Sequence, residues 1–183
     1  PVFQPAACLV HADWQAFDRG TATAEEVVDR TVVRLGLDRE ALVTLVSEIG
    51  ERLVPMPESV ALLTRLHALR AQQQANGGEP LGLYYLSNMP VPYARTLERL
   101  HPFLQDFDGG IFSGDVLLIK PEAAIYQLLQ TRYALEPAQT VFIDDLLGNI
   151  DAARNEGWHG IHFKNAAQVT QELQAVGLIA TGF

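Results

Sequence analysis

The chain has 183 residues, which allows one domain or one domain with a small accessory lobe, and it is long enough to bury a sizeable core. Its net charge of −9 argues against nucleic acid as the main partner, because a phosphate backbone requires a basic surface. The single cysteine, Cys8, excludes an internal disulfide, and no apolar run could span a bilayer, so we expect a cytoplasmic protein that does not enter a membrane.

The first part of the chain carries its apolar residues at helical spacing. Thr23 followed by two glutamates is typical of a helix start, and a further helix is predicted over residues 39–52. Two prolines just after residue 54 interrupt this pattern and mark a hinge. We therefore expect residues 1–54 to form a helical lobe and residues 55–183 to form a second region.

That second region changes to an alternation of strands and helices. It opens with an amphipathic helix around residues 60–69, which a polar loop over residues 72–80 follows. Short apolar runs, typical of buried parallel strands, then alternate with helical segments. The predicted strands are 81–86, 111–112, 141–143 and 160–163, and the predicted helices are 93–100, 121–133, 150–156 and 166–176. This alternation predicts an α/β fold with a doubly wound parallel sheet.

The strand predicted at 141–143 runs directly into two adjacent acids, Asp144 and Asp145. Open α/β folds hold their ligands at the carboxyl ends of their strands. Two neighbouring carboxylates repel each other unless a cation is present, and an oxygen-rich pair of this kind suits Mg²⁺. The alternative is that an Asp simply caps the following helix. Because a cap needs only one Asp, the pair favours a metal site.

Two further polar elements accompany the acid pair. Ser87 and Asn88 follow the strand at 81–86, and in a parallel sheet that strand end shares an edge with Asp144. A hydroxyl and backbone N–H groups suit phosphate oxygens, although Ser-Asn after a strand is also an ordinary turn signal. Lys120 precedes a predicted helix that starts with proline, where it could equally be a solvated surface charge. The prediction of a phosphate-binding site rests on the occurrence of Ser87, Asn88 and Lys120 together with the acid pair.

In their order and spacing, these residues resemble the second, third and fourth motifs of the haloacid dehalogenase (HAD) superfamily. The matching segments are Leu86-Ser87-Asn88, residues 107–115, Lys120-Pro121-Glu122, and residues 142–145 with Asn149, Ala152 and Ala153. Trp14, residues 17–20 and Thr23 resemble the end of the helical cap in the subgroup that includes sugar-phosphate phosphatases. The resemblance covers nearly all of the chain. It implies a HAD-like Rossmannoid core over 55–183 and a partial helical cap over 1–54.

The resemblance also implies a mechanism and a role for each matching residue. In the family, an Asp nucleophile attacks phosphorus and forms an aspartyl-phosphate, while Mg²⁺ shields the charge. Carried over to this chain, Ser87 hydrogen-bonds the phosphoryl oxygens with help from the backbone of Asn88, and Lys120 neutralises charge on the phosphoryl group. Asp145 is the implied metal ligand. Asp144 is either a second ligand beside it or a residue of the outer coordination shell. The expected substrate is a small phosphate monoester.

The chain departs from the family in its first motif, an apolar strand that ends in Asp-x-Asp-Gly. Residues 6–10 are apolar enough for a strand but lack that ending, and residues 106–110 imitate the motif where the family has a turn. The strand of the first motif would be central in the sheet, so its loss would split the sheet and leave backbone groups unpaired. We therefore expect the nucleophile upstream of Pro1 and an inactive chain without it.

Two other functions stay open at this stage. The first is a non-catalytic HAD-like protein that binds a ligand or partner on the same scaffold. The second is a 2-haloacid dehalogenase, which is less favoured because that branch needs no Mg²⁺ and the Asp144–Asp145 pair favours a metal. The sequence indicates neither the identity of the substrate nor the oligomeric state.

Overall fold

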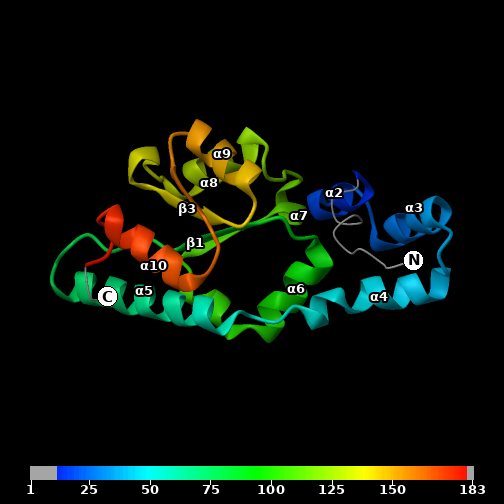
Figure 1. The fold of residues 1–183 in the computed structure, drawn as a ribbon, viewed down its shortest axis with the longest axis horizontal. Helices are drawn as coiled ribbons and strands as arrows, with labels where there is room; N and C mark the ends of the chain where they lie inside the picture. Colours follow the sequence, from blue (N-terminus) through cyan, green and yellow to red (C-terminus); the bar gives the residue numbers. More distant parts are fainter. Residues whose placement is uncertain (1–11, 181–183) are drawn as a thin grey trace. The chain divides into compact units, whose positions relative to one another are not determined.

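The computed structural model describes residues 12–180, so Cys8 and the apolar run at residues 6–10 lie outside the described part of the chain (Figure 1). The described residues fall into two units that the chain enters and leaves several times. The first unit comprises residues 12–54, Tyr85–Pro102 and Gly110–Ile119, and the second comprises residues 55–84, 103–109 and 120–180.

The first unit is mainly helical. It contains α2 (Ala12–Arg19), α3 (Ala24–Leu35), α4 (Arg39–Arg52), α6 (Val91–Leu100), the short α7 (Ser113–Val116), and most of the strands β1 (Tyr84–Ser87) and β2 (Gly109–Phe112). The Asp38 side chain accepts a hydrogen bond from the Ala41 amide at 2.8 Å and so starts α4. Gly36 ends α3 with a φ of 65°, a conformation that favours glycine. The helix predicted over 39–52 is confirmed.

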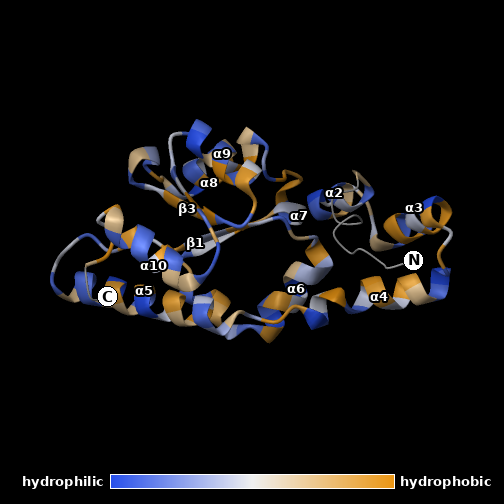
Figure 2. Cartoon of the chain, viewed as in Figure 1, coloured by the Kyte–Doolittle hydropathy of each residue, from blue (hydrophilic) through white to orange (hydrophobic). Residues whose placement is uncertain are grey.

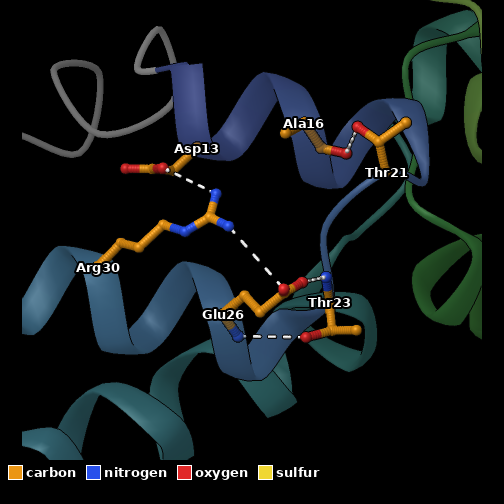
Figure 3. Close-up of polar contacts among 6 residues, drawn as sticks. All are labelled: Asp13, Ala16, Thr21, Thr23, Glu26 and Arg30. Atoms are coloured by element: carbon orange, nitrogen blue, oxygen red, sulfur yellow. Dashed lines mark hydrogen bonds and ion pairs between the residues drawn. The ribbon is translucent and has the colours of Figure 1, made fainter.

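A reciprocal pair of hydrogen bonds starts α3 (Figure 3). The Thr23 hydroxyl accepts from the Glu26 amide at 3.2 Å, and the Glu26 carboxylate accepts from the Thr23 amide at 2.8 Å. Arg30 lies one turn further on and contacts both Glu26, at 3.8 Å, and Asp13 of α2, at 3.3 Å. The cap predicted at Thr23 is therefore present, and Arg30 joins it to the preceding helix.

Three aromatic rings from α2 and α6 form the centre of the first unit. Phe17 and Tyr93 meet edge to face with ring centroids 5.4 Å apart, and Trp14 lies 5.6 Å from Phe17 and 6.4 Å from Tyr93. The Tyr93 hydroxyl donates to the Val46 carbonyl in α4 at 2.6 Å, which satisfies the polar end of a buried ring. Trp14 thus packs with core residues of this unit.

The second unit carries helices, the remaining strands and two short 3₁₀ segments. Its elements are α5 (Pro57–Ala75), most of η1 (Pro102–Asp106), α8 (Ala123–Tyr133), η2 (Pro137–Gln139), β3 (Val141–Asp144), α9 (Leu147–Asn155), β4 (His159–His162) and α10 (Ala166–Ala175). Strands β3 and β4 run parallel, and their register pairs Val141 with His159 and Asp144 with His162. The acid that ends β3 therefore lies opposite the last residue of β4.

Apolar side chains, most of them from α5, β4 and α10, build one core cluster of the second unit. Its buried members are Leu62, Leu66, Leu83, Ile161, Val169, Leu173 and Ile179. Figure 2 shows apolar and polar residues interleaved along α5 and α10, as expected for helices with one buried face.

None of the helices within residues 12–180 has the length and apolar character needed to cross a bilayer.

The strands of the described residues form two separate two-stranded sheets, one of β1 and β2 and one of β3 and β4. The α/β class predicted from the sequence is confirmed by the parallel β3–β4 pair and the helices that alternate with the strands. Residues 12–180 therefore contain no single continuous sheet.

Several element boundaries differ from those predicted. Helix α5 continues to Ala75, whereas the sequence predicted a loop from residue 72, because glutamine is a good helix former. Helix α8 begins at Ala123, two residues after the predicted start at Pro121. The single turn α7 was not predicted, since four residues carry too little periodicity to be recognised.

Candidate functional site

The carboxylate of Asp144 lies buried at the end of β3. Phe142, two residues earlier on the same face of the strand, packs against Tyr126 and Trp158 with ring centroids 5.5 and 5.9 Å away. This packing fixes the strand and leaves Asp144 only 8% exposed. A carboxylate at that depth is stable only if its oxygens are hydrogen-bonded or paired with a charge.

Lys120 supplies the opposite charge. Its ammonium nitrogen lies 2.5 Å from Oδ2 of Asp144, and the two side chains are 9% and 5% exposed. The same nitrogen lies 5.5 Å from the centre of the Phe142 ring, whose face adds a weaker attraction for the cation. Lys120 precedes a cis peptide bond to Pro121. The structure therefore brings Lys120 and Asp144 together, and it makes them a buried, charge-neutral pair.

Two amide groups hold the other oxygen of Asp144. Oδ1 accepts from the backbone N–H of Leu146 at 2.8 Å and from the side-chain amide of Asn149 at 2.9 Å. Asn149, on α9, is itself buried, and its backbone carbonyl accepts a hydrogen bond from the Tyr126 hydroxyl at 2.9 Å. Burial and the nearby charge of Asp144 raise the pKa of Tyr126, so this hydroxyl stays a donor. With both oxygens occupied, Asp144 has a fixed orientation.

Asp145 differs from its neighbour because it is exposed. Its carboxylate is a hard oxygen ligand of the kind that Mg²⁺ prefers, and Mg²⁺ is commonly held by one or two carboxylates together with waters and phosphate oxygens. No group of three or more His, Cys, Asp or Glu side chains within residues 12–180 has the arrangement of a metal site. The exposed carboxylate of Asp145 is an oxygen donor of the type that suits Mg²⁺, whereas both oxygens of Asp144 are taken up by other contacts.

The other predicted phosphate-binding residues, Ser87 and Asn88, lie at and just after the end of β1 in the first unit. The turn they begin is held by Ser113, which is fully buried. The Ser113 hydroxyl oxygen accepts from the Met89 amide at 2.8 Å, and its proton is donated to the carbonyl of Asp18 at 2.5 Å. Lys120 and Asp144 belong to the second unit, so the convergence of Ser87 with them stays a prediction.

The motif-like segment at residues 106–110 has a structural role at Asp108. The Asp108 carboxylate pairs with Arg70 at 2.6 Å, and it accepts a hydrogen bond from the Leu83 amide at 2.9 Å. The Asp108 amide in turn donates to the Leu83 carbonyl at 2.7 Å. These contacts fix the chain just before β1 and β2, as expected for a turn.

Sequence reasoning overlooked three side chains that shape these segments: Tyr126, Ser113 and His162. Ser113 lies inside a segment that had been matched to the family, but a serine between a strand and a helix carries no distinctive signal of its own. Tyr126 occupies an apolar position of α8 and could not be told from an ordinary core residue. His162 forms no metal-ligand spacing with the other histidines, so the sequence assigned it no role.

Comparison with known proteins gives one family and several relatives. The family of haloacid dehalogenase-like hydrolases matches residues 6–157. The sesquiterpene phosphatase astK of Aspergillus oryzae is 26% identical over 165 residues, which are 90% of this chain and 79% of that protein. Four further curated relatives are much longer, and the chain spans only 13% to 30% of their length.

Solved structures share the fold. A HAD family enzyme from Bacteroides thetaiotaomicron, in complex with magnesium and inorganic phosphate, superimposes with a TM-score of 0.62 at 21% identity and covers 85% of this chain and 76% of its own. The L-2-haloacid dehalogenase of Xanthobacter autotrophicus gives a TM-score of 0.61 at 21% identity, with 96% and 70% covered. At this level of identity, the likeness concerns the fold alone.

Proposed function

Because the chain belongs to the haloacid dehalogenase-like hydrolases, we propose that it is a Mg²⁺-dependent phosphatase of small phosphate monoesters. The observation that carries the proposal is the buried Lys120–Asp144 pair directly beside the exposed Asp145. The relative astK, which is named a phosphatase and aligns with 90% of the chain, supports phosphate chemistry over the dehalogenase alternative.

The charges at the end of β3 explain why a metal is needed. Lys120 carries one positive charge, and Asp144 already balances it at 2.5 Å. Adding Asp145 makes this group of three side chains net negative, and a phosphate dianion would be repelled. Bound Mg²⁺ would supply the missing positive charge and act as a Lewis acid toward the phosphoryl oxygens. Asp145 would hold the ion, and Asp144 would keep the neighbouring lysine in place.

The remaining residues act by positioning the substrate. We propose that the Ser87 hydroxyl donates to a phosphoryl oxygen, that the backbone N–H of Asn88 donates to another, and that the Lys120 ammonium faces the charge that develops during transfer. Phosphoryl transfer depends mainly on such positioning and charge neutralisation. The reaction would pass through an aspartyl-phosphate, and we assign the nucleophilic Asp to none of residues 12–180.

The proposal also concerns the part of the substrate to which the phosphate group is attached. We propose that residues 1–54 act as the helical cap that selects the substrate and that residues 55–183 form the core. Sugar phosphates follow from the resemblance to the cap subgroup. The second candidate class is sesquiterpene phosphates, because astK is named a sesquiterpene phosphatase. Both are small phosphate monoesters, so a panel that contains the two classes distinguishes them.

The test uses the protein expressed from its complete coding sequence. With Mg²⁺ it should hydrolyse p-nitrophenyl phosphate, and excess EDTA should stop turnover until Mg²⁺ is restored. Lys120→Ala should lower kcat by at least about a hundredfold, because it removes charge stabilisation from the transition state. Lys164→Ala changes the chain's other lysine, which is exposed, and should leave kcat unchanged.

Three results would contradict the proposal. Hydrolysis that persists in EDTA would remove the metal from the mechanism. Binding of phosphate monoesters without any turnover would favour the non-catalytic alternative. Chloride release from 2-chloropropionate, with no phosphatase activity, would favour the dehalogenase alternative.

A further inference from the structure

A single peptide unit, the one between Asp145 and Leu146, is held at both of its ends. Its N–H, which belongs to Leu146, donates to Oδ1 of Asp144 at 2.8 Å. Its carbonyl, which belongs to Asp145, lies 3.0 Å from Nε2 of His162. Since a carbonyl oxygen only accepts, the imidazole donates through Nε2–H. A peptide unit is planar, so fixing both ends sets its orientation and the position of the Asp145 Cα, from which the carboxylate projects.

His162 reaches this carbonyl because of the register of the sheet. It is the last residue of β4 and pairs with Asp144, the last residue of β3. The ladder continues one step further, where the Phe163 amide donates to the Asp144 carbonyl at 2.9 Å. The imidazole therefore comes from the strand next to the acid pair, which places a donor beside the peptide that directly follows the two acids.

The His162 backbone is braced from α10. Its carbonyl accepts a hydrogen bond from the Gln168 side-chain amide at 3.2 Å. The oxygen of the same amide accepts from the Lys164 backbone N–H at 3.0 Å. Gln168 thus closes the turn between β4 and α10 and holds His162 where its ring meets Asp145.

From these contacts we propose that His162 is a positioning residue for Mg²⁺ binding, an inference that rests on the proposed function. It touches neither the substrate nor the metal; it fixes the Asp145–Leu146 peptide so that the Asp145 carboxylate is already aimed at the ion. Asp145 is exposed, so water could satisfy its carbonyl if the imidazole were absent. The loss of His162 should therefore cost more in metal affinity than in folding.

The chain contains a matched control on the same strand. His159 is the first residue of β4, and its Nε2 lies 3.0 Å from the carbonyl of Ala138. The two histidines thus make the same kind of contact, from ring nitrogen to backbone carbonyl, at opposite ends of one strand. His159 pairs with Val141, at the end of β3 away from the acids.

The experiment measures the Mg²⁺ dissociation constant by isothermal titration calorimetry on the protein expressed from its complete coding sequence, with no substrate present. His162→Phe keeps the ring and removes the donor, and it should weaken Mg²⁺ binding by about tenfold, as loss of an outer-shell partner commonly does. His162→Gln restores an N–H donor and should recover most of that affinity. His159→Phe should bind Mg²⁺ within about twofold of the parent, because its lost contact is of the same kind as that of His162 but remote from the acids.

Four outcomes would overturn the inference. His162→Phe could bind Mg²⁺ as tightly as the parent, or the two Phe variants could weaken binding equally. A His162→Phe protein that fails to fold, while His159→Phe folds, would show that the imidazole serves the fold instead. A parent that binds no Mg²⁺ would overturn the proposed function and this inference with it, whereas the first three outcomes leave the proposed function standing.

Discussion

Asp144 and Asp145 are adjacent in sequence but have opposite environments. Asp144 is buried with both oxygens occupied, and Asp145 is exposed. The sequence predicted the pair as one metal site, and the structure assigns the two residues different tasks. Asp144 organises Lys120 and the start of α9, whereas Asp145 is exposed and is the residue that we propose as the Mg²⁺ ligand.

This division of tasks predicts opposite effects for two matched substitutions. Asp144→Asn leaves the buried ammonium of Lys120 without its countercharge and should lower the free energy of unfolding by about 3 kcal/mol. Asp145→Asn relieves the repulsion between neighbouring carboxylates and should leave that free energy within about 0.5 kcal/mol, while Mg²⁺ binding is lost. Urea unfolding and Mg²⁺ titration measure the two quantities. Equal losses of stability in both variants would contradict the assignment.

A second carboxyl group, that of Asp18 at the end of α2, is perturbed by burial. Burial raises its pKa from 3.8 to about 7, and the buried phenol of Tyr93 lies close enough to sense its charge. Between about pH 4 and pH 7, the folded protein holds this proton and the unfolded chain has released it. The contribution of Asp18 to stability therefore falls as the pH rises through this range, and it is constant above it.

Replacing Asp18 removes this pH dependence. Asp18→Asn should raise the free energy of unfolding at pH 8 by on the order of 2 kcal/mol and have a smaller effect at pH 4.5, because the parent carboxyl is neutral in the fold at low pH. Urea unfolding at several pH values measures the difference. Asp151→Asn, at a side chain that is 59% exposed, is the control for replacing an aspartate at the surface and should change the free energy of unfolding by less than about 1 kcal/mol. Parallel pH profiles for the parent and Asp18→Asn would contradict the prediction.

At the scale of elements, the absence of a side chain at Gly20 allows the end of α2 to approach α7 closely. Gly20 follows α2 with a φ of +83°, and a Cβ there would lie 2.7 Å from the carbonyl oxygen of Gly114 in α7. The same region carries the bond from Ser113 to the carbonyl of Asp18. The end of α2 is thereby attached to the residue that holds the turn after Ser87.

This close approach predicts a strong effect of adding one methyl group. Gly20→Ala should lower the free energy of unfolding by about 2 kcal/mol or more, because it combines a left-handed backbone with a clash against backbone atoms. Gly148→Ala, on α9, meets nothing within 4 Å and should be neutral or stabilise by up to about 1 kcal/mol. Thermal and urea unfolding compare the two variants. A Gly20→Ala protein as stable as the parent would rule out the close approach.

At the scale of the whole molecule, the sequence predicted the order of elements and the acids at the end of β3, since both follow from local periodicity. The helix over 39–52 and the α/β class are examples. It could not predict that the Asn149 amide and the Leu146 N–H would donate hydrogen bonds to Oδ1 of Asp144, because those contacts depend on how α9 packs against β3. The same holds for His162, whose partner is set by the register of two strands separated by a helix.

We propose above all that Ser87, Lys120 and Asp145 act on one phosphate group. The most direct measurement is a crystal structure of the protein, expressed from its complete coding sequence, with Mg²⁺ and inorganic phosphate. We predict one phosphate within hydrogen-bond distance of both the Ser87 hydroxyl and the Lys120 ammonium, and Mg²⁺ bound by the Asp145 carboxylate. A structure in which Ser87 and the Lys120–Asp144 pair face different sites, or in which Mg²⁺ binds away from Asp145, would contradict the account.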